Sequence, residues 1–89
     1  SPSRFFTVFK KETGMTPIEY KNYICVNNAQ KMLLATNLSI EEIGGNLGFN
    51  SASYFRRTFK KYVGKSPSEY RNNVNSDFKI WVMANYRNV

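Results

Sequence analysis

A row of polar and cationic side chains in the second half of the chain has the spacing of one helix face. The row follows the positions i, i+3, i+4 and i+7 and consists of Ser53, Arg56, Arg57 and Lys60. Arginine offers paired donors that match guanine edges in the major groove of DNA, while serine and lysine suit phosphate oxygens. A helix face that is only exposed to solvent usually carries charges of both signs. Residues 56–65, however, contain five cations and no acid. The row therefore indicates binding to DNA.

The helix that would carry this row is bounded by recognisable signals. An apolar stripe at i, i+4 and i+7 lies on its other side and consists of Phe55, Phe59 and Tyr62. Asn50 or Ser51 can cap its start, and the helix should end near Gly64, because glycine adopts the left-handed backbone at low cost.

A second, shorter helix is predicted just before it. Ser39 and Glu42 have the spacing of a capping box, and this helix runs to about Leu47 and stops at Gly48. Phe49 can fill the space between the two helices. A short capped helix, a tight turn and a second helix form a helix-turn-helix, here from residue 38 to residue 61.

The beginning of the chain repeats the second half at an offset of 50 residues. Residues 1–20 and 51–70 are identical at 10 of 20 positions, which predicts two copies of one structural unit. The outward face of the first copy consists of Ser3, Phe6, Thr7 and Lys10, with Arg4 beside it. Phe6 either meets thymine methyl groups or packs on a neighbouring helix. The chain has two lysine pairs, Lys10–Lys11 and Lys60–Lys61. Each pair either contacts phosphates or only adds charge that keeps the protein in solution.

The rest of the chain is also predicted to be helical, so the predicted fold class is all-α. The longest helix should run from Pro17 to about Thr36 with apolar residues on two sides, and no stretch shows the alternation of a strand. Residues 72–76 form a polar break. Residues 77–86 are a short terminal helix in this interpretation, with Phe78, Trp81 and Val82 on its apolar side. This side either packs on the body, which we favour, or belongs to a loose end that contacts another domain or protein.

Composition excludes most catalytic and metal chemistry. The 89 residues hold 13 Lys plus Arg, 6 Asp plus Glu, one Cys and no His, so the formal charge is +7. A single cysteine without histidine leaves no Cys/His zinc site, no intrachain disulfide and no paired nucleophile. The adjacent acids Glu41 and Glu42 point apart on their helix. We therefore expect no enzyme activity, no metal and no cofactor.

The remaining alternatives concern the partner of the basic face. The longest apolar run has five residues, far fewer than the roughly 20 that cross a bilayer, and we expect a soluble cytoplasmic protein that does not bind membranes. The basic face and the apolar tail could instead form a protein–protein interaction module. A footprint on one defined duplex separates this hypothesis from DNA recognition.

Residues 38–71 (LSIEEIGGNLGFNSASYFRRTFKKYVGKSPSEYR) and residues 9–20 (FKKETGMTPIEY) resemble the DNA-binding domain of the AraC/XylS family of bacterial transcription regulators. The resemblance implies two helix-turn-helix units joined by one long helix, and sequence-specific binding to double-stranded DNA. It divides the chain into a remnant of the first unit (1–16), a linker helix (17–36), the second unit (37–72) and a tail (73–89). It also implies RNA polymerase as a partner and a sensor or receiver domain outside this chain.

The resemblance assigns roles to individual residues. Base-edge contacts are implied for Ser53, Arg56 and Arg57 in the second unit and for Ser3, Arg4 and Thr7 in the first. Backbone contacts are implied near the helix starts, at Ser39 and Asn50. Gly44 and Gly45 depart from the family pattern, and each should cost roughly 1 kcal/mol relative to alanine. The chain also opens inside the first recognition helix, so we expect an incomplete first unit.

Overall fold

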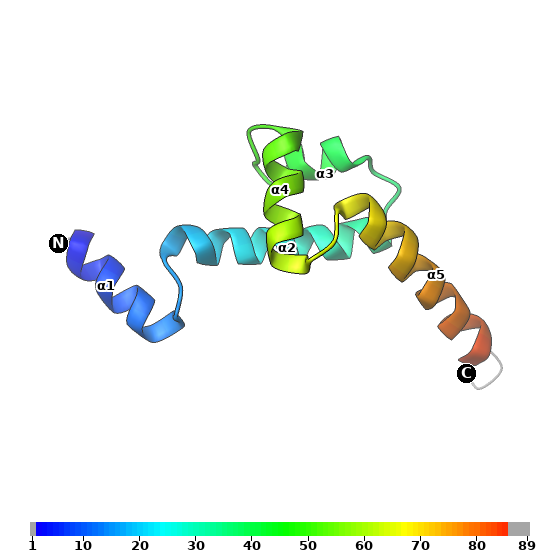
Figure 1. The fold of residues 1–89 in the computed structure, drawn as a ribbon, viewed down its shortest axis with the longest axis horizontal. Helices are drawn as coiled ribbons and strands as arrows, with labels where there is room; N and C mark the ends of the chain where they lie inside the picture. Colours follow the sequence, from blue (N-terminus) through cyan, green and yellow to red (C-terminus); the bar gives the residue numbers. More distant parts are fainter. Residues whose placement is uncertain (1, 86–89) are drawn as a thin grey trace.

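The described part of the chain, residues 2–85 of the computed structural model, consists of helices and short connections (Figure 1). In chain order the helices are α1 (Pro2–Thr13), α2 (Pro17–Ala35), α3 (Ile40–Asn46), α4 (Ala52–Val63) and α5 (Pro67–Asn85). No strand occurs in this part of the chain, which confirms the predicted all-α class. None of these helices is both long and apolar enough to span a membrane.

Hydroxyl side chains start four of the helices. The caps accept a hydrogen bond from the backbone N–H three residues later, and they are Thr16, Ser39, Ser51 and Ser66. At Thr16 the capping box is complete, because the Glu19 carboxylate accepts from the Thr16 N–H at 3.2 Å. At Ser39 and Ser66 the glutamate three residues later accepts from the serine hydroxyl instead, at 3.1 Å. The cap of α4 is Ser51 rather than Asn50.

The turn between α3 and α4 depends on a glycine and an aromatic ring. Gly48 has φ +88°, a left-handed conformation that glycine adopts without strain. Phe49 follows, and its N–H donates to the Gly44 carbonyl at 2.9 Å. The Phe49 ring lies 5.1 Å from the Phe55 ring, measured between centroids. Phe49 therefore fills the space between the two helices, as predicted.

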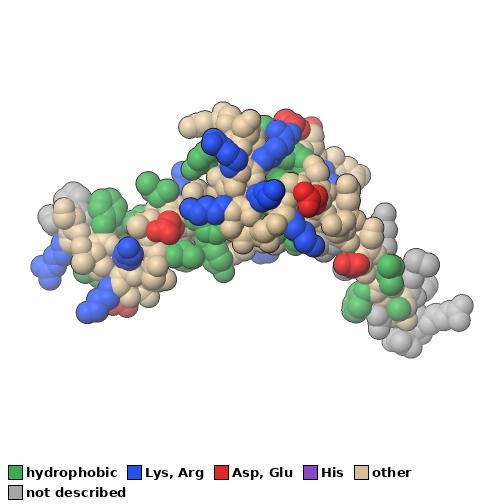
Figure 2. Space-filling model, in the orientation of Figure 1, with side chains coloured by type: hydrophobic (Ala, Val, Ile, Leu, Met, Phe, Trp, Pro, Cys, Tyr) green, Lys and Arg blue, Asp and Glu red, His purple; other side chains and the backbone are tan. Residues whose placement is uncertain are grey.

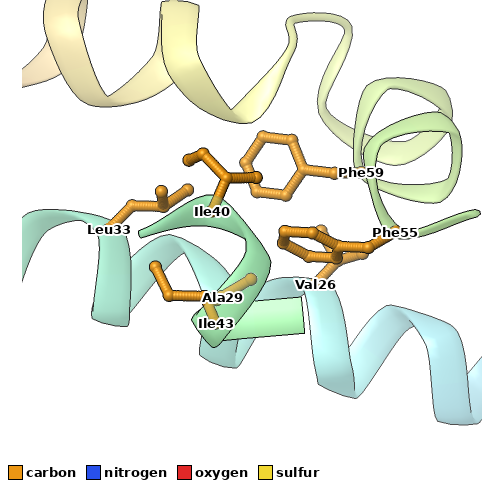
Figure 3. Close-up of a cluster of buried hydrophobic side chains, with 7 residues drawn as sticks. All are labelled: Val26, Ala29, Leu33, Ile40, Ile43, Phe55 and Phe59. Carbon is orange, nitrogen blue, oxygen red and sulfur yellow. The ribbon is translucent and has the colours of Figure 1, made fainter. Parts of the chain in front are cut away.

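The hydrophobic core is small and lies between α2, α3 and α4 (Figure 3). Its buried members are Val26, Ala29, Leu33, Ile40, Ile43, Phe55 and Phe59. Helix α2 contacts each of the other four helices, so it is the element on which the fold is assembled. The two apolar sides predicted for it differ: one forms the core, while Tyr23 and Ile24 are exposed.

Helix α1 lies outside this core, at one end of α2 (Figure 1). Its Phe9 ring meets the Tyr20 ring edge to face, with centroids 5.5 Å apart. Phe5 is 57% exposed, whereas Phe55, its counterpart in the repeat, is fully buried. The Cα radius of gyration is 16.4 Å, whereas a compact chain of this length has about 12 Å. The molecule is therefore elongated, with α1 and α5 at opposite ends.

Helix α5 corrects the prediction for the last part of the chain. It runs from Pro67 to Asn85 without interruption, so the break predicted at residues 72–76 is wrong. Asparagine costs a few tenths of a kcal/mol per residue in a helix, and no glycine or proline occurs there to stop it. Trp81, on the side predicted to pack on the body, is 61% exposed, and its neighbour Ile80 is 65% exposed. The side chains of Phe78 and Val82, and Tyr86 as a whole, lie outside the described residues.

Candidate nucleic-acid interface

Helix α4 buries one side and exposes the other. Phe55, Thr58 and Phe59 are buried. At 100° per residue the opposite side is centred on Ser53, Arg57 and Lys60, all of which are exposed. Lys and Arg side chains gather over this helix in Figure 2. The packing of α4 on α2 and α3 therefore fixes a polar and cationic row that faces solvent.

Arg56 stands apart from this row, on the side of α4 that faces α3. Its Nη2 forms an ion pair with Oε1 of Glu41. A hydrogen bond from the Glu41 backbone and this bond from Arg56 hold the pKa of the Glu41 carboxyl below its ordinary value. Arg56 and Arg57 are adjacent in sequence, yet the fold gives them different surroundings.

The other flank of the row faces α2 across two shallow grooves. The first has a volume of about 240 Å³ and is lined by Asn22, Tyr54, Arg57, Thr58 and Lys61. The second, of about 290 Å³, lies between α2 and the turn before α4, and its lining includes Lys21, Cys25 and Asn50. Arg57 and Lys61 therefore share a surface with α2. Asn50 is exposed at the mouth of the turn.

Ser39 has a local structural task. Its Oγ accepts from the Glu42 N–H at 3.0 Å and donates to the Glu42 carboxylate at 3.1 Å. The half-buried Ser39 thus fixes the start of α3. Backbone N–H groups at a helix N-terminus point outward along the axis and favour an anion such as phosphate.

The candidate residues of the first copy form a separate group on α1. Ser3, Arg4, Thr7 and Lys10 are exposed, and Figure 1 shows α1 away from α4, at one end of α2. The Thr7 hydroxyl donates to the Ser3 carbonyl at 2.9 Å. Phe6, on the same face, is 52% exposed. The structure thus divides the predicted residues into two groups, one on α1 and one around α4.

Sequence reasoning missed the contributions of neighbouring helices to this surface. The sequence identifies Glu41 as an acid but not as the partner of Arg56. It also gives no sign that Lys21, Asn22 and Tyr54 line this surface. No sequence spacing links Asn22 to Arg57, because the groove arises from the crossing of α2 and α4. In the described residues, no group of three or more His, Cys, Asp or Glu side chains could hold a metal ion.

Comparison with known proteins places this geometry in a family. A sequence model of a helix-turn-helix domain matches residues 1–73. The DNA-binding domain of AdpA, solved in complex with a target DNA, is similar with a TM-score of 0.82 and 30% identity, over 86% of this chain and 69% of that chain. A crystal structure from Chromobacterium violaceum described as AraC-type has a TM-score of 0.75 and 30% identity, over 81% and 64%. The chain belongs to the AraC-type helix-turn-helix family.

Other relatives of this AraC-type domain are known regulators. The arabinose operon regulatory protein of Escherichia coli K12 is 37% identical over 57 residues, which is 64% of this chain and 20% of the regulator. The chain thus spans one fifth of that protein's length. The matches confirm the predicted family, the tandem helix-turn-helix fold class and the predicted function class, a sequence-specific DNA-binding domain of a transcription regulator.

Proposed function

We propose that this AraC-type domain places α4 in the major groove of double-stranded DNA. In this arrangement Ser53 and Arg57 contact base edges, while Lys60 and Lys61 contact phosphates. The observation that carries the proposal is the solvent-facing row opposite the buried Phe55 and Phe59. A helix reads base edges with the face that does not pack on its own protein, and this is the face where the cations lie.

Two further contacts complete the proposed binding mode. The N-terminal ends of α3 and α4, near Ser39 and Asn50, meet the DNA backbone, since helix N-termini favour phosphate. Helix α1 contacts a second segment of the same duplex through Ser3, Arg4, Thr7 and Lys10. The separation of α1 from α4 along α2 supports two contacts on one duplex (Figure 1).

We propose that the domain works in the cytoplasm as part of a larger regulator. A sensor or receiver domain would supply the signal, and RNA polymerase would be the partner at the promoter. The arabinose regulator, of which this chain matches one fifth, supports this proposal.

Arg57→Ala tests the proposed role of α4. The preferred duplex is first selected from a random DNA pool with the natural chain, and the affinities of both chains are then compared on that duplex and on random DNA. Because a bidentate contact to guanine discriminates by about 1–3 kcal/mol, the loss on the preferred duplex should be about 5- to 150-fold, with a much smaller loss on random DNA.

Lys31→Ala is the matched control. It removes one cation from the exposed side of α2 and should leave the preference for the selected duplex unchanged. Equal losses on both DNAs for Arg57→Ala would reduce Arg57 to a backbone contact and contradict the proposal.

A further inference from the structure

Glu41 and Arg56 form an ion pair that connects α3 to α4. Oε1 of Glu41 accepts from Nη2 of Arg56, and the two side chains remain 59% and 44% exposed. The pair therefore lies in solvent at the edge of the helix-turn-helix and outside the hydrophobic core. Its contribution to stability is small, since exposed pairs contribute little.

The two adjacent arginines of α4 present different charges to an approaching DNA duplex. Arg57 lines a groove with Lys61 and has no acidic residue beside it in that lining. Arg56 touches a carboxylate, so the pair as a unit carries almost no net charge. A phosphate that bound Arg56 would have to displace Glu41 and would leave this anion beside the polyanion.

We propose that Glu41 is a positioning residue that withholds Arg56 from the DNA. Glu41 keeps the Arg56 guanidinium on α3, so that Arg57 contacts the bases and Arg56 neither reads bases nor binds phosphate. This inference rests on the proposed placement of α4 in the major groove. In a chain with a formal charge of +7, neutralising one cation next to the interface limits the sequence-independent part of the affinity.

Glu41→Gln tests the proposal through the salt dependence of binding. Loss of the carboxylate frees Arg56 for one additional phosphate, so the slope of log K against log[salt] should become steeper by about 0.9 on both the selected and the random duplex. At 0.1 M salt, one additional released counterion raises the affinity by up to about eightfold. Fluorescence anisotropy titrations at four or more salt concentrations measure both quantities.

Glu42→Gln is the matched control, since it removes the same charge from the neighbouring position of α3 and leaves the pair with Arg56 intact. Its slope should equal that of the natural chain. The double variant Glu41→Gln/Arg56→Met should also return to the natural slope, because methionine keeps the aliphatic stem and lacks the charge.

Two results would overturn the inference. One is a Glu41→Gln slope equal to the Glu42→Gln slope. The other is a slope that becomes shallower by about one unit in the double variant Glu41→Gln/Arg56→Met, which would mean that Arg56 already binds a phosphate. Arg57→Ala in the same titrations tests the placement of α4 separately. If Arg57→Ala keeps the preference for the selected duplex, the placement of α4 fails, whatever the Glu41 variants show.

Discussion

The Nε of Arg71 in α5 donates a hydrogen bond to the backbone carbonyl of Leu33 in α2 at 3.0 Å, across 38 residues of sequence. Its Nη2 donates to the carbonyl of Thr36 at 3.2 Å. The last carbonyls of a helix have no partner within the helix, and a cation there also interacts favourably with the helix dipole. Arg71 therefore completes the C-terminal end of α2 from a different helix.

Arg71→Ala should lower the free energy of unfolding by about 1.5–3 kcal/mol, the range for a hydrogen bond to a charged group. Arg71→Lys keeps the charge but cannot reach two carbonyls with a planar group, so its loss should be smaller. Urea denaturation followed by circular dichroism measures both variants. A similar loss in Lys65→Ala, at an exposed position, would contradict a specific role for Arg71.

The adjacent glycines of α3 should respond differently to alanine. A Cβ atom on Gly45 meets nothing within 4 Å, whereas one on Gly44 lies 3.0 Å from the Phe55 ring. Gly45→Ala should therefore stabilise the fold by about 0.5–1 kcal/mol. Gly44→Ala should stabilise the fold less than Gly45→Ala, because the Phe55 ring must move to make room for the methyl group. Thermal denaturation of the two variants measures the difference, and equal stabilities would contradict the close contact at Gly44.

The two halves of the sequence repeat should differ in their sensitivity to truncation. Phe55→Ala and Phe59→Ala should each cost about 3–5 kcal/mol, as buried aromatic residues do, and should unfold the α3–α4 unit. Phe5→Ala should cost about 1 kcal/mol or less, because this side chain is 57% exposed and buries a smaller area. Urea denaturation of the three variants measures these losses. A similar loss at Phe5 would show that α1 belongs to the same cooperative core.

Glu19 should contribute a pH-dependent part of the stability. Hydrogen bonds from the Thr16 backbone, and then from its side chain, hold the pKa of the Glu19 carboxyl below the ordinary value of 4.5. A depressed pKa means that the folded state favours the ionised group. This stability is present above pH 4.5 and is lost as the pH falls through the folded-state pKa. Glu19→Gln should flatten the acid side of the curve of melting temperature against pH, and an unchanged acid side would contradict this role of Glu19.

Lys60→Ala should make the slope of log K against log[salt] shallower by about 0.9, if Lys60 contributes one phosphate contact as proposed. The loss of affinity should be the same on the selected duplex and on random DNA, because a phosphate contact carries no sequence information. Titrations on both duplexes over a range of salt concentrations provide the measurement. A larger loss on the selected duplex would assign Lys60 to the bases instead.

Local signals predicted most of the fold. Ser39 caps α3 where the sequence places the start of a helix, and Gly64 ends α4 in the left-handed conformation. The error lies in residues 72–76, where five polar or weakly helix-forming residues were interpreted as a break. Helix preferences of that size are too small to stop a helix that has already started, so the sequence there was ambiguous.

The candidate site was less predictable than the helices that carry it. Periodicity identifies the exposed side of α4, because the buried Phe55 and Phe59 define the opposite side. Periodicity cannot identify which residues of neighbouring helices lie next to the exposed side of α4. The Glu41 contact of Arg56 and the groove between Asn22 and Arg57 depend on how α3 and α2 cross α4. Crossing angles follow from packing of the whole core rather than from the spacing of residues in one helix.

The position of α1 outside the core has a consequence for how the complex with DNA forms. In the proposed binding mode, helix α4, which is held by buried side chains, meets the duplex as a preformed surface. Helix α1 is attached through the short connection at residues 14–16, so in that mode its own contact becomes intramolecular once α4 is bound. A tether this short gives an effective concentration on the order of millimolar. An α1 contact too weak to form by itself can then still slow the dissociation of the whole domain.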